Sequence, residues 1–355
     1  MSRELLFVVS CCHSAFARKV EPELAVLEPQ VDWPMFLRLA RFHRVQGLLW
    51  NALAGTAPDL PSEIADGLAA DAASIAQHNL RAAAESAALL QAFEVHGIPL
   101  LFVKGLTLGK VAYGTIATKA SVDIDVMTEA ARLAPAASAL RERGYRLCEP
   151  DTETKLSPWH ALRKESMWLR DDPPLQVDLH TRLADNPRLI PTIGIESARQ
   201  TVEVAPGIQL PTLAGDELFA YLAVHGASSA WFRLKWITDF AALIHHHPPQ
   251  ELERLHRRSL ELGAGRAAAQ ALLLADSLFG TLSEAPALKQ SLRRDSRSRL
   301  LFGIARRQLS GCAEPIEPTS TTLGTAAIHY SQFLLLPGLA FKLSELIRQG
   351  HAAVA

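Results

Sequence analysis

Cysteine is scarce in this chain, and its scarcity excludes a disulfide framework. The 355 residues include only Cys11, Cys12, Cys148 and Cys312, and no pair has Cys-x-x-Cys spacing. A chain of this length can bury enough apolar surface to fold without disulfide bonds. We therefore expect a reducing compartment, the cytoplasm.

A large net charge is also lacking. The chain has 36 Lys and Arg against 37 Asp and Glu, so its formal net charge is −1. This balance argues against general nucleic-acid binding or attraction to an anionic membrane, although a local basic patch remains open. With 48% hydrophobic and 21% charged residues, the composition indicates a globular protein with one large domain or two to three smaller ones.

Long apolar runs are absent as well, so no transmembrane segment is expected. The run Leu5–Cys12 is short for a signal-peptide core, and Glu4 interrupts the basic residues before it. We interpret it as a first buried helix or strand, with export as the minor alternative. The run Phe333–Phe341 is too short to span a bilayer and contains Pro337 and Gly338, although it could form a docking surface.

The residues that are present predict an α+β fold in which a small mixed sheet is flanked by helical regions. The expected division is a helical region at 1–95, an α/β core at 96–211 and a second helical region at 212–355. No internal repeat or linker marks these boundaries, which rest on the change from helical to strand-like periodicity. The main expected elements are a long helix at 62–96, strands at 98–103, 122–127, 145–148, 162–170 and 175–180, a short helix at 106–113, and a helix at 288–309.

Two acidic strands carry the chemistry. Asp123 and Asp125 alternate with Ile124 and Val126, which places both carboxylates on one face of a strand. Two like charges side by side repel, and a divalent cation with a preference for oxygen ligands, such as Mg²⁺, would relieve that repulsion. Asp178 lies on a second strand of the same character and can supply a third ligand. A strand with one solvated acidic face is the simpler alternative.

A turn suited to phosphate precedes these strands. Gly105 follows an apolar strand and permits close approach of the backbone, and the helix expected from Leu106 offers free N–H groups to an anion. Lys104, Lys119 and Arg182 are the expected cationic contacts, although Lys104 could be a surface charge at a strand end.

The order of these motifs resembles that of the polymerase-beta-like nucleotidyltransferase superfamily and, within it, a bacterial group described as uncharacterised nucleotidyltransferases. The resemblance covers about residues 30–245. It rests on Phe102-Val-Lys-Gly-Leu106, Lys119-x-x-x-Asp-Ile-Asp-Val126, Glu142-Arg-Gly-Tyr145, Val177-Asp-Leu-His180, Leu222-Ala-Val-His225 and Arg233-Leu-Lys-Trp-Ile-Thr-Asp239.

The chain departs from the family pattern at three positions. The superfamily usually has Gly-Ser at the turn, where this chain has Gly105-Leu106; Lys104 would replace the missing hydroxyl, and Thr107 is the nearest one. The group commonly has Arg four residues before the first Asp, where Lys119 keeps the charge but loses the bidentate fork. Thr181 stands in place of the usual aromatic residue.

The resemblance implies a nucleotidyltransferase that binds two Mg²⁺ ions, with Mn²⁺ as an alternative, through Asp123, Asp125 and Asp178. A nucleoside triphosphate, ATP among them, would donate the nucleotide to a hydroxyl or phosphate of an unknown small molecule, sugar or peptide. The expected substrate contacts are Lys104, Gly105, Thr107, Lys119, His180 and Arg182. The alternatives are another transfer reaction on a phosphorylated small molecule or modified peptide, or a catalytically weak binding or regulatory protein.

Two histidines and a tryptophan have plain structural interpretations beside functional ones. His180 could orient Asp178, bind metal, or be a satisfied structural histidine. On the expected C-terminal helices, His225 and Trp236 are interpreted as core residues and not as ligand contacts.

Overall fold

The computed structural model describes residues 1–17, 31–55, 60–310 and 316–352. Cys312 lies outside these residues. The helices are α1 (Arg3–Ala17), α2 (Trp33–His43), α3 (Gln46–Leu53), α4 (Ser62–Val95), α5 (Leu106–Tyr113), α6 (Leu133–Glu142), α7 (Leu156–Leu162), α8 (Gly215–Ser228), α9 (Leu234–Ile244), α10 (Pro249–Glu261), α11 (Ala267–Phe279), α12 (Pro286–Arg294), α13 (Ser296–Leu309), α14 (Thr322–Leu334) and α15 (Leu339–Ala352). The strands are β1 (Leu101–Phe102), β2 (Ile124–Met127), β3 (Arg146–Glu149), β4 (Glu165–Asp171), β5 (Pro174–His180), β6 (Arg199–Ala205) and β7 (Ile208–Leu213).

A small mixed sheet lies at the centre of the fold, so the predicted α+β class is confirmed. Its strand order is β1-β2-β5-β4-β3. β2 and β5 run parallel, with Asp125 opposite Asp178, whereas the other neighbouring pairs are antiparallel. The strands β6 and β7 form a separate hairpin. The parallel pair brings the two acidic motifs side by side although they lie some fifty residues apart in the chain.

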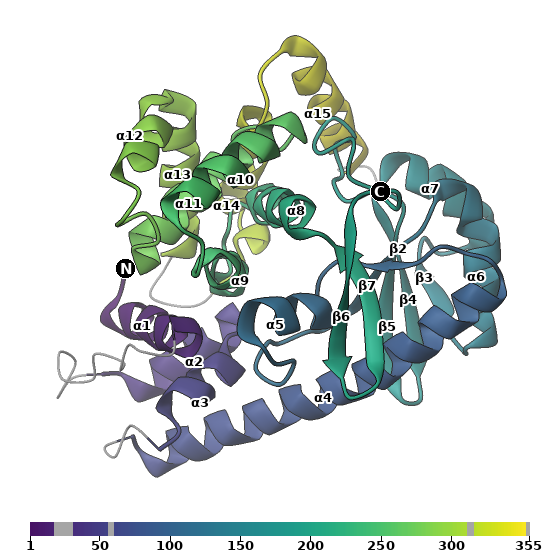
Figure 1. Cartoon of the computed structure of the whole chain (residues 1–355), viewed down its shortest axis with the longest axis horizontal. Helices are drawn as coiled ribbons and strands as arrows, with labels where there is room; N and C mark the ends of the chain where they lie inside the picture. Colours follow the sequence, from purple (N-terminus) through teal and green to yellow (C-terminus); the bar gives the residue numbers. More distant parts are fainter. Residues whose placement is uncertain (18–30, 56–59, 311–315, 353–355) are drawn as a thin grey trace.

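Helices α4 and α6 and the β6–β7 hairpin pack with the sheet around one hydrophobic core. The long helix α4 runs along one side of the molecule, from the N-terminal helices to the sheet (Figure 1). Its C-terminal half buries Leu89 and Phe93 in a cluster that also contains Leu140 of α6 and Trp168 of β4. The helix therefore joins the sheet to the N-terminal part of the chain.

A second core joins the two ends of the chain. Phe7 of α1 and Phe36 of α2 are buried in the same cluster as Phe219 of α8, Phe240 of α9 and Leu301 of α13. Figure 1 shows α1 near α9 and α11, on the side of the molecule away from β3. Among the described helices, none is long and apolar enough to cross a membrane.

Several predicted elements differ at their ends. The strand expected at 98–103 is shortened to Leu101–Phe102, although the Val103 N–H also donates to the Asp125 carbonyl at 3.2 Å. The acidic strand begins at Ile124, so Asp123 lies just before it. The strand expected from residue 162 begins at Glu165 because α7 extends to Leu162. The helix expected at 288–309 is two helices, since Asp295 caps the N-terminus of α13. The division at 95 and 211 stays a prediction.

Candidate active site

Three carboxylates converge where β2 and β5 lie side by side. Asp125 is in β2, Asp123 precedes that strand, and Asp178 is the register partner of Asp125 on β5. One carboxylate oxygen from each lies within 4.8 Å of the others. Asp125 is 3% exposed, whereas Asp123 and Asp178 are half-buried. Asp123 and Asp178 are therefore partly accessible to solvent, whereas Asp125 is enclosed by the protein.

Lys104 supplies the positive charge inside this cluster. Its Nζ donates to Asp125 Oδ2 and lies 3.6 Å from Asp123 Oδ1. Burial alone would raise the pKa of Asp125, but Lys104 and His180 outweigh it and hold that pKa below its usual value. Burial alone would lower the pKa of Lys104, but Asp123 and Asp125 raise it well above its usual value. Lys104 and Asp125 are therefore both charged at neutral pH.

Asp178 titrates differently from the two acids on the neighbouring strand. Burial raises its pKa to about 7, and the negative charges of Asp125 and Asp123 contribute in the same direction. The Gln176 amide donates to Asp178 Oδ1 at 2.8 Å, which opposes the shift only in part. Near neutral pH this carboxyl is therefore present in both its protonated and its deprotonated form. A general base needs a pKa in this range.

His180 links the cluster to a further acid. Its Nε2 lies 3.1 Å from Asp125 Oδ1 and 3.1 Å from Glu165 Oε2, and the ring is fully buried. Glu165 faces His180 across the β4–β5 pair and also accepts from Lys164. The histidine therefore orients Asp125, whereas the sequence suggested Asp178 as its partner. With Asp125 and Glu165 it also forms a second group of ligand atoms within 4.8 Å.

The turn after β1 has the expected form. Gly105 has φ 67° and directly precedes α5, a conformation that L side chains rarely adopt. A Cβ at Gly105 would lie 3.9 Å from Ser121 Oγ, a buried hydroxyl without a hydrogen-bond partner among the described residues. The Thr107 hydroxyl instead donates to Lys104 O and lies 3.2 Å from the Thr212 hydroxyl. Ser121 is thus the unengaged hydroxyl beside the turn.

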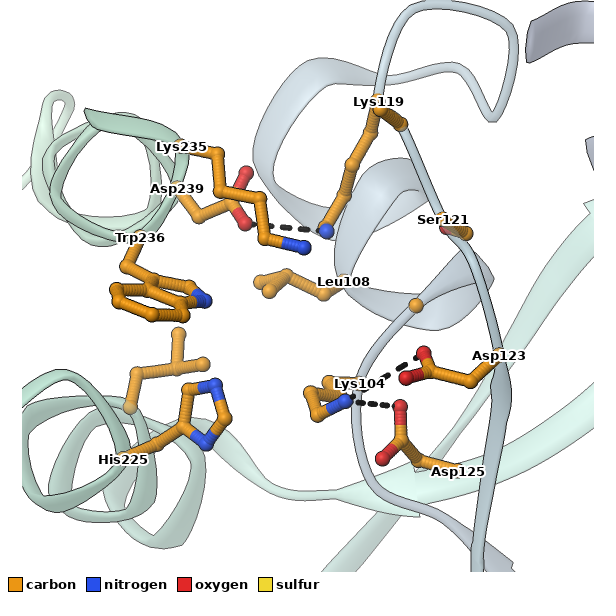
Figure 2. Close-up of a pocket in the computed structure, with 13 residues that line it drawn as sticks. Lys104, Leu108, Lys119, Ser121, Asp123, Asp125, His225, Lys235, Trp236 and Asp239 are labelled. Carbon is orange, nitrogen blue, oxygen red and sulfur yellow. Dashed lines mark hydrogen bonds and ion pairs between the residues drawn. The ribbon is translucent and has the colours of Figure 1, made fainter. Parts of the chain in front are cut away.

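A pocket opens between the turn, the acids and the C-terminal helices. Figure 2 shows Asp123, Asp125 and Lys104 at one end and Lys119 and Lys235 at the other. The Lys119 ammonium pairs with Asp239 of α9 at 3.1 Å. The other lining residues are Gly105, Leu108, Ala120, Ser121, Leu222, His225, Trp236 and Asp239.

Three of the six predicted contacts line this pocket, whereas Thr107, His180 and Arg182 do not. Lys104, Gly105 and Lys119 line it. Thr107 lines a smaller neighbouring cavity. The Arg182 guanidinium donates to the carbonyls of His160 and Ala184 and is not a lining residue.

Four residues of the site were given no role from the sequence, although Lys235 and Asp239 lie in one of the motifs that carry the family resemblance. Glu165 lies at a strand start and has no acidic neighbour to mark it. Lys235 and Asp239 are spaced i, i+4 in an apolar helix, a signal that could have indicated one polar face directed into a site. Ser121 is two residues before Asp123 but belongs to no recognisable pattern.

The acidic cluster fits a divalent metal. Three carboxylates provide the hard oxygen donors that Mg²⁺ or Mn²⁺ prefers. The Lys104 ammonium lies between two of these carboxylates, which shows that they accommodate a positive charge.

The fold and this cluster define a nucleotidyltransferase-like protein. A family model described as "Uncharacterised nucleotidyltransferase" matches residues 29–280. The chain belongs to that family, which confirms the resemblance seen in its motifs. A search of curated proteins finds no match.

Proposed function

We propose that this protein is a metal-dependent nucleotidyltransferase that uses a nucleoside triphosphate. The observation that carries the proposal is the meeting of Asp123, Asp125 and Asp178 where two parallel strands lie beside a glycine turn and a helix N-terminus. Membership of the nucleotidyltransferase family supports it. ATP is one candidate nucleotide, and the acceptor would be a hydroxyl or phosphate of a small molecule, sugar or peptide.

In this reaction an acceptor oxygen attacks the α-phosphorus of the triphosphate. A new P–O bond forms, the bond to the β-phosphate breaks, and pyrophosphate leaves. Bound Mg²⁺ would neutralise charge on the transferring phosphate and lower the pKa of the attacking oxygen. Asp178 takes the acceptor proton. Lys104 and the backbone at Gly105 hold the phosphates, and His180, 3.1 Å from Asp125 Oδ1, orients the carboxylate that would hold the ion.

The proposal assigns different roles to Asp125 and Asp178. Asp125→Asn should abolish both metal-supported triphosphate binding and transfer, because the buried carboxylate holds the ground state as well as the transition state. Asp178→Asn should leave triphosphate binding nearly intact but reduce transfer at least about 100-fold, because its proton acceptor is lost. Asp66→Asn on the exposed face of α4 is a matched control.

The test has two measurements. Calorimetric titration of each nucleoside triphosphate with Mg²⁺ or Mn²⁺ gives binding. Incubation of the labelled triphosphate with cell extract, followed by identification of the labelled product, gives transfer and the acceptor. Equal binding by wild type and Asp125→Asn would exclude the metal site, and full transfer by Asp178→Asn would exclude its role as base.

A further inference from the structure

Among the described residues, Lys235 is the lysine of the pocket that has no hydrogen-bond or ion-pair partner. Lys104 is paired with Asp123 and Asp125, and Lys119 is paired with Asp239. Lys235, on the first turn of α9, makes no hydrogen bond or ion pair with any part of the chain that the structure describes. Figure 2 shows its ammonium beside that of Lys119, facing into the space above Leu108. Two adjacent cations, one of them unpaired, favour an anion between them and the glycine turn.

The Ser121 hydroxyl lies on the opposite wall of the same pocket. It is buried, it has no partner among the described residues, and it lies beside Gly105 at the start of α5. A hydroxyl, two ammonium groups and the free N–H groups of a helix start are the donors that phosphate oxygens accept.

We propose that Lys235, together with Lys119 and the Ser121 hydroxyl, binds the phosphates of the triphosphate that leave as pyrophosphate. This inference rests on the proposed function, since it assigns the two ends of the triphosphate to the two ends of one pocket. The α-phosphate lies at the aspartates, and the β- and γ-phosphates lie toward α9. The C-terminal helical region thereby becomes part of the nucleotide site.

A pH dependence accompanies this arrangement. Burial lowers the pKa of Lys235 to about 7, and Lys119 and Lys104 contribute in the same direction. As pH rises through 7 the amine loses its proton, so its attraction for phosphate should fall. The charged and titratable groups near it are Lys119, Lys104, Arg44, Asp123, His225 and, on α9 itself, Asp239.

The first experiment is calorimetric titration of inorganic tripolyphosphate with Mg²⁺ into the full chain at pH 6.5. We expect Lys235→Met to bind tripolyphosphate about tenfold more weakly than wild type, the loss of one charge-assisted contact. Lys235→Arg should retain the affinity. Lys110→Met, which removes a lysine of α5 outside the pocket lining, is the matched control. Equal affinity in wild type and Lys235→Met, or an equal loss in Lys110→Met, would overturn the inference.

The second experiment uses nucleotides of different length. Lys235→Met should weaken binding of a nucleoside triphosphate about tenfold while leaving that of the monophosphate unchanged, because only the outer phosphates reach α9. Equal weakening for both would place Lys235 at the α-phosphate or the nucleoside and overturn the assignment. The ratio of wild-type to Lys235→Arg affinity for triphosphate should fall between pH 6 and 8, and parallel profiles would contradict the role of the Lys235 ammonium.

The outcomes separate this inference from the proposed function. If wild type binds triphosphate and transfers nucleotide, but Lys235→Met does so equally well, the inference fails and the function stands. If tripolyphosphate binding depends on Lys235 but no nucleotide is bound or transferred, the anion subsite stands and the function fails. Absence of binding by any of these probes to wild type would overturn both.

Discussion

At the scale of single residues, the Lys104 ammonium balances the negative charge of the acidic cluster. Its ammonium lies between Asp123 and Asp125. We expect Lys104→Met to leave these acids uncompensated and to lower the free energy of unfolding by about 3–5 kcal/mol in metal-free buffer. The same variant should bind Mg²⁺ more tightly in the absence of nucleotide, because no internal cation competes. Thermal unfolding and Mg²⁺ titration measure the two effects, and unchanged values for both would show that Lys104 does not compensate the acids.

Asp178 gives the second prediction at this scale, a pH-dependent stability. Its pKa is raised to about 7 in the folded protein, against about 4 in an unfolded chain. The folded state therefore holds a proton that the unfolded state releases between these values. Relative to Asp178→Asn, wild type should lose on the order of 1–3 kcal/mol as pH rises from about 4 to 7. Urea unfolding in metal-free buffer measures this difference, and a constant difference across that range would contradict the raised pKa.

At the scale of elements, the segment between α5 and β2 carries Lys119 and depends on close packing from two helices. Asn79 of α4 donates to the carbonyls of Ile116 at 2.5 Å and Lys119 at 2.8 Å. Gly47 of α3 lies so close that an added Cβ would be 2.4 Å from the carbonyl oxygen of Thr118. The position of Lys119 is therefore set by helices that lie far from it in the sequence.

Gly47→Ala should displace this segment. We expect a loss of about 1–3 kcal/mol in the free energy of unfolding, since backbone must move to admit the methyl group, and a weaker triphosphate affinity through Lys119. Gly303→Ala in the middle of α13 is the control, because nothing lies within 4 Å of its added Cβ. That variant should be more stable by about 0.5–1 kcal/mol. Thermal unfolding compares the stabilities of the Gly47→Ala and Gly303→Ala variants. Equal stabilisation by both would show that the segment at Thr118 moves without cost to admit the methyl group.

The sequence predicted the strands and helices of the site better than it predicted which of them lie next to one another. Alternation of Asp with aliphatic residues was enough to place Asp123 and Asp125 together. That Asp178 lies beside Asp125 depends on the parallel pairing of β2 with β5, which no local pattern encodes. Glu165 reaches His180 only through the register of the β4–β5 pair, and Lys235 reaches the pocket only because α9 packs against α5. These contacts depend on tertiary structure, which the periodicity of the sequence does not predict.

At the scale of the whole molecule, one core contains both ends of the chain. Phe7 and Phe36 are buried with Phe219 and Phe240, and Leu301 belongs to the same cluster. A fragment of residues 1–211 would expose the apolar faces of α1 to α3. We expect it to lack the cooperative unfolding transition of the full chain and to associate in solution. Circular dichroism on heating and light scattering test this, and a monomeric fragment with a sharp transition would contradict it.

The shared core also sets the order of events while the chain is being made. Synthesis proceeds at about 5–20 residues per second, so α1 and α2 wait on the order of ten seconds or more for α8 to α11 to emerge. During that interval the aromatic side chains of the first two helices have no native partners, whereas α4, the sheet and α6 can already assemble. The acidic strands would then form before the lysine-bearing helix α9 that completes the pocket, so the nascent protein would bring its three aspartates together before Lys235 joins them.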